Sequence, residues 1–170
     1  HSRVRRQRQM CIRDRVAGVI DIDGNLSASQ NVSSDTGAIS VAGTATTTGG
    51  ADITGATGVS VSGTSSLNGD VTATANNVTL GGNVTLTADS VITAAGTIGV
   101  TGSVDGAFDL TLAGTGGSDV SNTVGTTIVD LTVNDGALVA GVIDIDGNLS
   151  ASQNVSSDTG AISVAGTATT

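Results

Sequence analysis

An all-β fold is predicted for residues 16–170, namely a right-handed parallel β-helix (a β-solenoid) in which about 20 residues form each three-strand rung. Two observations lead to this prediction. Aliphatic residues alternate with small polar residues over short stretches, which is typical of half-buried strands. These stretches recur 19 or 20 residues apart, with no helical pattern between them. Stacked parallel strands explain both, because equivalent residues of successive rungs then lie over one another.

The first strand of each rung is marked by two inward aliphatic residues separated by one outward residue. Such pairs occur at Ile20/Ile22, Ile39/Val41, Val59/Val61, Val78/Leu80, Ile98/Val100, Ile143/Ile145 and Ile162/Val164. Between the fifth and sixth pairs only Val120 fits the series, with longer gaps of 22 and 23 residues. On the first pair Asp21 points outward, and the next outward positions are Ser40 and Ser60. We therefore expect that like charges are not stacked directly over one another, where they would repel.

Two further strands complete each rung. The second strand is predicted at Leu26/Ala28, Ala45, Leu67, Val84/Leu86, Val104, Val124 and Leu149. The third is predicted at Val32, Ile53, Val71/Ala73, Val91, Phe108/Leu110/Leu112, Val129/Leu131/Val133 and Val155. Gly and Asn occupy many of the corners, as at Gly24-Asn25, Gly49-Gly50, Gly81-Gly82 and Gly116-Gly117. We expect positive φ angles at these corners, which Gly and Asn tolerate best.

Charge is divided very unevenly along the chain. All six Arg lie in residues 1–15, whereas residues 16–170 contain fourteen Asp and no Lys, Arg, Glu or His, against a net charge of −9 for the whole chain. A surface this acidic predicts no nucleic-acid partner and no attraction to anionic membranes. No apolar run approaches the ~20 residues that span a bilayer, so no membrane insertion by this segment is expected. Scarce aromatic residues and high charge would also suit a disordered chain, but the regular aliphatic recurrence favours order.

Residues 1–15 form a separate segment. The string RRQRQMCIRDR (residues 5–15) resembles the translation of a transposase-type sequencing adapter. We interpret residues 1–15 as a non-native, adapter-derived leader and expect it to be disordered. The alternative is a basic arm that binds nucleic acid or acidic lipid, in which Cys11 beside Arg would be a candidate reactive thiol.

A long internal repeat supports the boundary at residue 16. Residues 16–47 are identical to residues 139–170, 123 positions later. We interpret residues 16–170 as one continuous β-helix fragment and the 123-residue unit as six rungs. Whether this identity is genuine or a product of sequence assembly is open at this point.

Catalytic chemistry is not predicted. Most nucleophile and base arrangements need His, Cys, Lys or Glu, which residues 16–170 lack. The closest carboxylate pairs, Asp21/Asp23 and Asp105/Asp109, could serve as the two acids of a glycosidase-type mechanism, but solvated surface carboxylates are the preferred interpretation. We therefore predict no enzyme activity, no catalytic residue and no cofactor.

Metal and modification motifs are also weak. Asp21-Ile-Asp23-Gly-Asn25, repeated at 144–148, resembles the start of a Ca²⁺ loop, but Leu26 and Val32 stand where an EF-hand needs Gly and Glu. We predict no dedicated metal site and leave weak divalent binding by surface Asp open. Thr44–Thr48 raises the alternative of an ice-binding face, but neighbouring rungs offer Ser27 and Ser66 there, so an unbroken threonine ladder is not expected. Asn-x-Ser/Thr sequons occur at Asn25, Asn31, Asn77, Asn83, Asn148 and Asn154, as a composition rich in these residues produces by chance.

Phrases such as NNVTLGGNVTLTA (76–88) and VDGAFDLTLAG (104–114) resemble the β-strand-repeat passenger regions of filamentous-haemagglutinin-like and autotransporter-type bacterial adhesins. The resemblance covers residues 16–170 and rests on composition and repeat style. It implies an extracellular location at the bacterial outer-membrane surface and a role in attachment, aggregation or biofilm. The implied partners are a host or neighbouring-cell surface, glycans, or other copies of the chain. The alternative function is that of non-catalytic rungs in a carbohydrate-active β-helix enzyme whose active site lies elsewhere.

Overall fold

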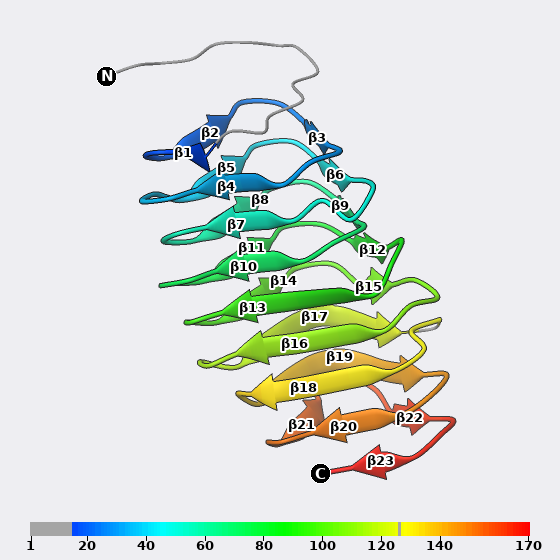
Figure 1. Ribbon diagram of the computed structural model, residues 1–170. Helices are drawn as coiled ribbons and strands as arrows, with labels where there is room; N and C mark the ends of the chain where they lie inside the picture. The colour runs from blue at the N-terminus through cyan, green and yellow to red at the C-terminus, as the bar shows by residue number, and fades with distance from the viewer. Residues whose placement is uncertain (1–14, 126) are drawn as a thin grey trace.

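The computed structural model describes residues 15–125 and 127–170 and shows a solenoid of parallel strands (Figure 1). It contains about seven rungs of about 20 residues and no helix among the described residues. As the chain descends in Figure 1, the front strands run from right to left and the rear strands from left to right, which is a right-handed winding. The predicted fold class is therefore confirmed. Residues 1–14, with Cys11 and most of the predicted leader, lie outside the described residues, and Arg15 begins the first strand.

The strands form three faces, which we number in the order in which the chain visits them. Face 1 contains β2 (Ile20–Ile22), β5 (Ile39–Val41), β8 (Val59–Val61), β11 (Val78–Leu80), β14 (Ile98–Val100), the first part of β17 (Ser118–Gly125), the first part of β19 (Leu138–Ile145) and β21 (Val155–Ser157). Face 2 contains β3 (Leu26–Ala28), β6 (Ala45–Thr47), β9 (Ser65–Leu67), β12 (Val84–Leu86), β15 (Val104–Asp105), the second parts of β17 and β19, and β22 (Ile162–Val164). Face 3 contains β1 (Arg15–Val16), β4 (Val32–Ser34), β7 (Ile53–Gly55), β10 (Val71–Ala73), β13 (Ser90–Ala94), β16 (Leu110–Gly114), β18 (Leu131–Asp135), β20 (Leu149–Ala151) and β23 (Ala168–Thr169).

Faces 1 and 2 are joined by two long strands. β17 and β19 each continue around the corner between the faces, which makes faces 1 and 2 one sheet of 14 strands beside the nine-stranded sheet of face 3. Each strand pairs only with equivalent strands of the rungs directly above and below it, all in parallel. The solenoid is thus held together by contacts between neighbouring rungs.

The interior is a continuous aliphatic column. Ile39, Val78 and Ile98 are fully buried on face 1, and Leu110 and Leu131 are fully buried on face 3. Burying a Val, Leu or Ile side chain contributes about 1.5–3 kcal/mol, so the column is the main source of stability. Several inward serines interrupt it, and among the described residues the hydroxyls of two of them, Ser65 and Ser118, have no hydrogen-bond partner. Their neighbours in the columns are aliphatic, which makes both positions weak points in the core.

The predicted strand series is right for the first five rungs and wrong near the C-terminus. After Val100, face 1 continues with Val120 and then with Ala140, at regular spacing. Ile143 pairs with Val124 on face 2 instead of following Val120, so the long gaps predicted around Val120 do not exist. The later assignments shift with it, because Leu149 lies on face 3 and Val155 on face 1.

The 123-residue unit is therefore not six whole rungs. Leu138 lies six rungs below Ile20 in the same column of face 1, through an unbroken series of pairings. Ile143, the equivalent of Ile20 in the second copy, follows on the next face. The unit spans six rungs and one further strand.

Two side chains of the predicted third strand also point the other way. Ile92 is buried and stacks on Val71, whereas Val91 faces outward with 36% of its surface exposed. Val129 is exposed as well, and Phe108 is only partly buried against the core. The inward members of face 3 are therefore the residues in register with Leu110 and Leu112. In the sequence, adjacent aliphatic residues such as Val91 and Ile92 leave this register ambiguous.

Glycine serves two purposes at the corners. Gly49 and Gly50 have φ angles of 65° and 75°, the left-handed region in which a Cβ is costly. At Gly81 φ is not positive, contrary to the expectation, but an added Cβ would lie 2.5 Å from the backbone oxygen of Ser62 in the rung above. Gly24 also lacks the predicted positive φ. Close stacking of rungs, as well as backbone conformation, therefore selects glycine.

Candidate functional site

The corners carry a set of side-chain hydrogen bonds that connect successive rungs. In each, the Oδ1 atom of an Asn or Asp accepts the backbone N–H of a residue one rung further on, over 2.6–3.2 Å. The acceptor and donor residues are Asn25 and Thr44, Asn31 and Asp52, Asp52 and Asp70, Asp70 and Val91, Asn77 and Thr97, Asn83 and Ser103, Asp89 and Asp109, Asp109 and Asp130, Asp130 and Asn148, and Asn148 and Thr167. We call this set the Asx ladder. It satisfies corner amides that the strand pairings leave without a partner.

At the corner that precedes the face-3 strands, the ladder places Asp carboxylates of the same charge above one another in successive rungs. Asp89, Asp109 and Asp130 follow one another in successive rungs, each bonded to the backbone of the next. The expectation that like charges avoid stacking holds at Asp21, which lies beside Ser40, but it is wrong at this corner. Each stacked carboxylate accepts an N–H from the following rung, and charge-assisted hydrogen bonds of this kind offset part of the repulsion.

Glycine in the next rung makes room for many of the ladder side chains. A Cβ added at these glycines would overlap the Oδ1 atom of the Asn or Asp above. The pairs are Gly43 with Asn25, Gly69 with Asp52, Gly96 with Asn77, Gly102 with Asn83, Gly147 with Asp130, and Gly166 with Asn148. The ladder residue and the glycine one rung later therefore form one structural unit, although about 20 residues separate them.

The sequons follow from the same geometry. In Asn77-Val78-Thr79 the Asn belongs to the ladder, Val78 is fully buried and Thr79 lies on the outer surface. The triplet Asp52-Ile53-Thr54 is arranged in the same way with Asp in place of Asn. Five of the six Asn-x-Ser/Thr triplets, those at Asn25, Asn31, Asn77, Asn83 and Asn148, thus begin with a ladder residue and follow from how strands begin in this fold.

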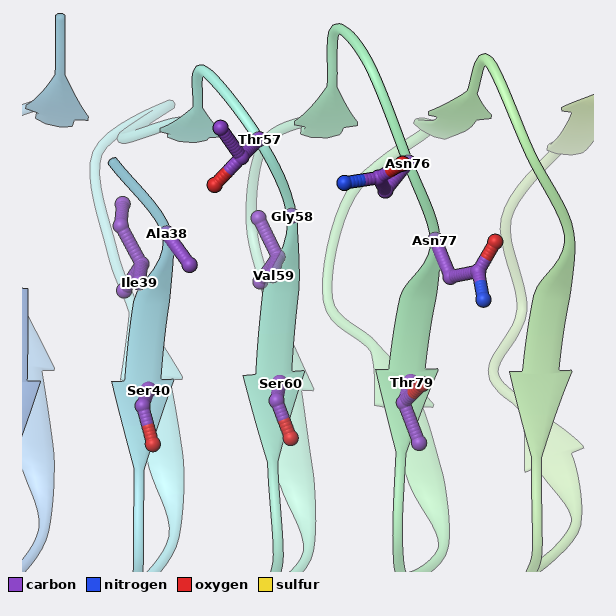
Figure 2. A pocket seen from close by; sticks show the side chains of 10 residues that line it. All are labelled: Ala38, Ile39, Ser40, Thr57, Gly58, Val59, Ser60, Asn76, Asn77 and Thr79. Carbon is purple, nitrogen blue, oxygen red and sulfur yellow. The ribbon is translucent and has the colours of Figure 1, made fainter. Parts of the chain in front are cut away.

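A shallow, open depression lies on face 1 over β5, β8 and β11 (Figure 2). The residues that line it are Ala38, Ile39, Ser40, Thr57, Gly58, Val59, Ser60, Asn76, Asn77 and Thr79. In Figure 2 the side chains of Ser40, Ser60 and Thr79 stand in a row along three successive rungs, and Asn76 lies at the corner that leads into β11. None of the lining side chains is titratable. The depression offers hydroxyl and amide groups, which suit hydrogen bonds to a neutral polar ligand and not acid–base chemistry.

Rows of hydroxyls like this one occur on all three faces. Face 2 carries Ser27, Thr46, Ser66 and Thr85 in register, and face 3 carries Ser33, Thr54, Thr72 and Thr93. Thr46 of the Thr44–Thr48 segment is thus one member of a mixed serine and threonine row. Because the rows are shared among the faces, they mark no single face as a specialised ice-binding surface.

The predicted carboxylate pairs lie in different surroundings. Asp21 and Asp23 are exposed on the first rung. The Oδ1 atom of Asp105 accepts the N–H groups of Gly106 and Thr127, at 2.9 and 3.1 Å, and Asp109 belongs to the Asx ladder. The carboxylates of Asp105 and Asp109 therefore both accept hydrogen bonds from backbone N–H groups. Within residues 15–125 and 127–170 no three His, Cys, Asp or Glu side chains converge as metal ligands would.

The outer surface is thus extended and polar, with rows of hydroxyls over three or four successive rungs of each face; the face-1 row gives way to Gly99, Asp119 and Val139. Comparison of the chain with protein-family models, with curated proteins and with solved structures finds no match. Across the part of the chain that the structure describes, no helix is long and apolar enough to cross a membrane.

Proposed function

We propose that residues 16–170 are a structural and adhesive segment of an extracellular protein at the bacterial outer-membrane surface. The observation that carries this proposal is the periodic outer surface. Ser40, Ser60 and Thr79 repeat the same group at the same place in successive rungs, and equivalent rows follow faces 2 and 3. A surface of this kind offers many equal, weak contacts in place of one strong site.

Attachment by such a segment depends on the number of rungs. Weak contacts that act together give an avidity far above that of each contact, and this avidity falls as contacts are removed. The same rungs act as a spacer of roughly 35 Å, at about 4.8 Å for each rung. The partners that suit this chemistry are neutral, hydroxyl-rich glycans on a host or neighbouring cell.

Deletion of whole rungs tests the proposal. Removing residues 40–59 joins Ile39 directly to Ser60. Ser60 pairs with Ser40 and takes its place after Ile39, so one rung is lost and the strand pattern is kept. Removing 40–78 or 40–98 removes two or three rungs in the same way. We expect beads coated with these variants to show a graded loss of attachment to arrayed neutral glycans and to cultured epithelial cells, in the order of rungs removed.

A matched control is the deletion of 40–49, which removes half a rung of about 20 residues and so brings the later strands out of register with the strands and corners of the rung above. Circular dichroism and thermal melting should show that the whole-rung variants remain folded and that the half-rung variant does not. Full attachment after the loss of three rungs would contradict the proposal. So would complete loss of attachment in a folded variant that lacks only one rung, because that result indicates a single localised site.

A further inference from the structure

The two identical segments, residues 16–47 and 139–170, fold alike. In the first copy Ile20 pairs with Ile39 and Leu26 with Ala45. In the second copy the equivalent pairs, Ile143 with Ile162 and Leu149 with Ala168, have the same register. The ladder bond of Asn25 to Thr44, at 2.9 Å, recurs at Asn148 and Thr167, at 3.0 Å. The local structure of this segment is therefore set by its own sequence.

The two copies nevertheless occupy different faces. Strand β2 of the first copy lies on face 1, and the equivalent residues 143–145 lie on face 2. Strands β3 and β4 lie on faces 2 and 3, and their equivalents β20 and β21 lie on faces 3 and 1. Every strand of the second copy is thus displaced by one face in the same direction.

The displacement follows from the length of the repeat. The inward column of face 1 that begins at Ile20 reaches Leu138 after six rungs. The chain then continues through the rest of β19 and reaches Ile143 on the next face. Strand β19 accommodates this because Leu138, Ala140, Ile143 and Ile145 all point inward along one continuous strand. The repeat and the rung therefore have different periods.

We infer that the long repeat presents one outward surface on two different sides of the solenoid. Asp21 and Ser27 of the first copy, and Asp144 and Ser150 of the second, are the same exposed residues facing different directions. If this surface is adhesive, which rests on the proposed function, the segment binds partners on more than one side. It then suits bridging between surfaces, such as the glycan coats of two neighbouring cells, and not flat attachment to one surface.

Disulfide mapping of the full chain, with Cys11→Ser as background, tests the displacement. In the structure Asp119 pairs with Val139 on face 1, so Asp119→Cys/Val139→Cys should form a disulfide on mild oxidation. If the repeat were six whole rungs, Ile145 would lie below Val120 and Asp144 would lie beside Asp119. Asp119→Cys/Asp144→Cys would then form the bond instead. The products are scored by non-reducing electrophoresis and by mass spectrometry of the linked peptides.

The control pair is Ser40→Cys/Ser60→Cys, whose register is the same in both arrangements. Paired strands place these positions about 4.8 Å apart, within the Cα range that a disulfide bridges. The inference is supported if a disulfide forms in the control pair and in the 119/139 pair but not in the 119/144 pair. Bonding of the 119/144 pair, or failure of the 119/139 pair while the control bonds, overturns it. Nitroxide labels on the same three pairs give a second readout, in which the 119/139 separation should equal that of the control.

This test does not depend on attachment. A solenoid with the predicted disulfide pattern and no adhesion would refute the proposed function alone. Rung-dependent adhesion together with a 119/144 disulfide would refute the displacement alone.

Discussion

At the scale of single residues, the corner side chains do as much to define a rung as the buried aliphatic ones. Asn77 is an example, since its Oδ1 accepts the Thr97 N–H at 2.9 Å and its side chain occupies the space that a Cβ at Gly96 would need. A hydrogen bond of this kind contributes about 0.5–1.5 kcal/mol. Repeated at many corners, it adds to the backbone strand pairings that hold each rung on the next.

Substitution of Gly96 with Ala tests this unit. We expect Gly96→Ala to lower the free energy of unfolding by about 1–2 kcal/mol, because the new methyl group displaces the Asn77 side chain from its hydrogen bond. In an Asn77→Ala background the same substitution should cost about 1 kcal/mol less, since the two residues are coupled. The measurement is a double-mutant cycle by urea unfolding.

Gly99→Ala is the matched control, because nothing lies within 4 Å of a Cβ added at this nearby glycine. It should be neutral or slightly stabilising, since Gly in a strand costs about 0.5–1 kcal/mol relative to Ala. Additive effects of Gly96→Ala and Asn77→Ala would contradict the proposed coupling.

At the scale of strands, the alternation of burial sets which substitutions the fold tolerates. On β11, Val78 is fully buried between Val59 and Ile98, whereas the adjacent Thr79 is exposed between Ser60 and Gly99. Neighbouring positions of one strand therefore lie in opposite environments.

Aspartate at these two positions should give opposite results. Val78→Asp places an unpaired charge in the aliphatic column, which costs several kcal/mol and disrupts the stack. Thr79→Asp lies on the surface beside uncharged neighbours and should change stability by less than about 0.5 kcal/mol. Circular dichroism and thermal melting compare the two variants, and equal losses of stability would refute the register of face 1.

The same alternation explains how far the fold could be predicted from sequence. For the first five rungs each face-1 strand has two inward aliphatic residues, so the period and the register follow directly. The prediction failed where β17 begins with the inward Ser118 and where β19 contains two inward pairs, at Leu138/Ala140 and Ile143/Ile145. Because the pair Ile143/Ile145 repeats Ile20/Ile22, the sequence predicts the same face for both. Sequence identity gives the local strand pairing but not the face on which a strand lies.

The Asx ladder was not predicted because the donors are backbone amides about 20 residues away, which belong to residues of many different types. A signal does exist in hindsight. An Asn or Asp before an inward aliphatic and an outward hydroxyl residue, as in Asn83-Val84-Thr85, is followed one rung later by a glycine, here Gly102. That no catalytic residues are present stays a prediction, which rests on the lack in residues 16–170 of most of the side chains that acid–base chemistry uses.

At the scale of the whole molecule, each rung is bonded only to the rungs next to it. Contacts therefore connect residues about 20 positions apart, and no contact between described residues ties one end of the solenoid to the other. Stability in such a fold is close to a sum over rungs and the interfaces between them. This additivity is what should permit whole rungs to be removed from the solenoid without unfolding the remainder.

The bonding of each rung only to its neighbours also determines how the solenoid resists a pulling force. Tension applied to the two ends along the axis loads the hydrogen bonds of one terminal rung at a time, so the rungs should peel away in sequence at low, similar forces. Each event releases about 20 residues, which extend the chain by roughly 60 Å beyond the height that the rung occupied. Single-molecule stretching should record evenly spaced steps of this size, whereas one abrupt rupture of the whole fold would show that distant rungs are mechanically coupled. A tether with this behaviour lengthens under load and dissipates work in small portions, so that a cell held by it is restrained gradually and without a sudden break.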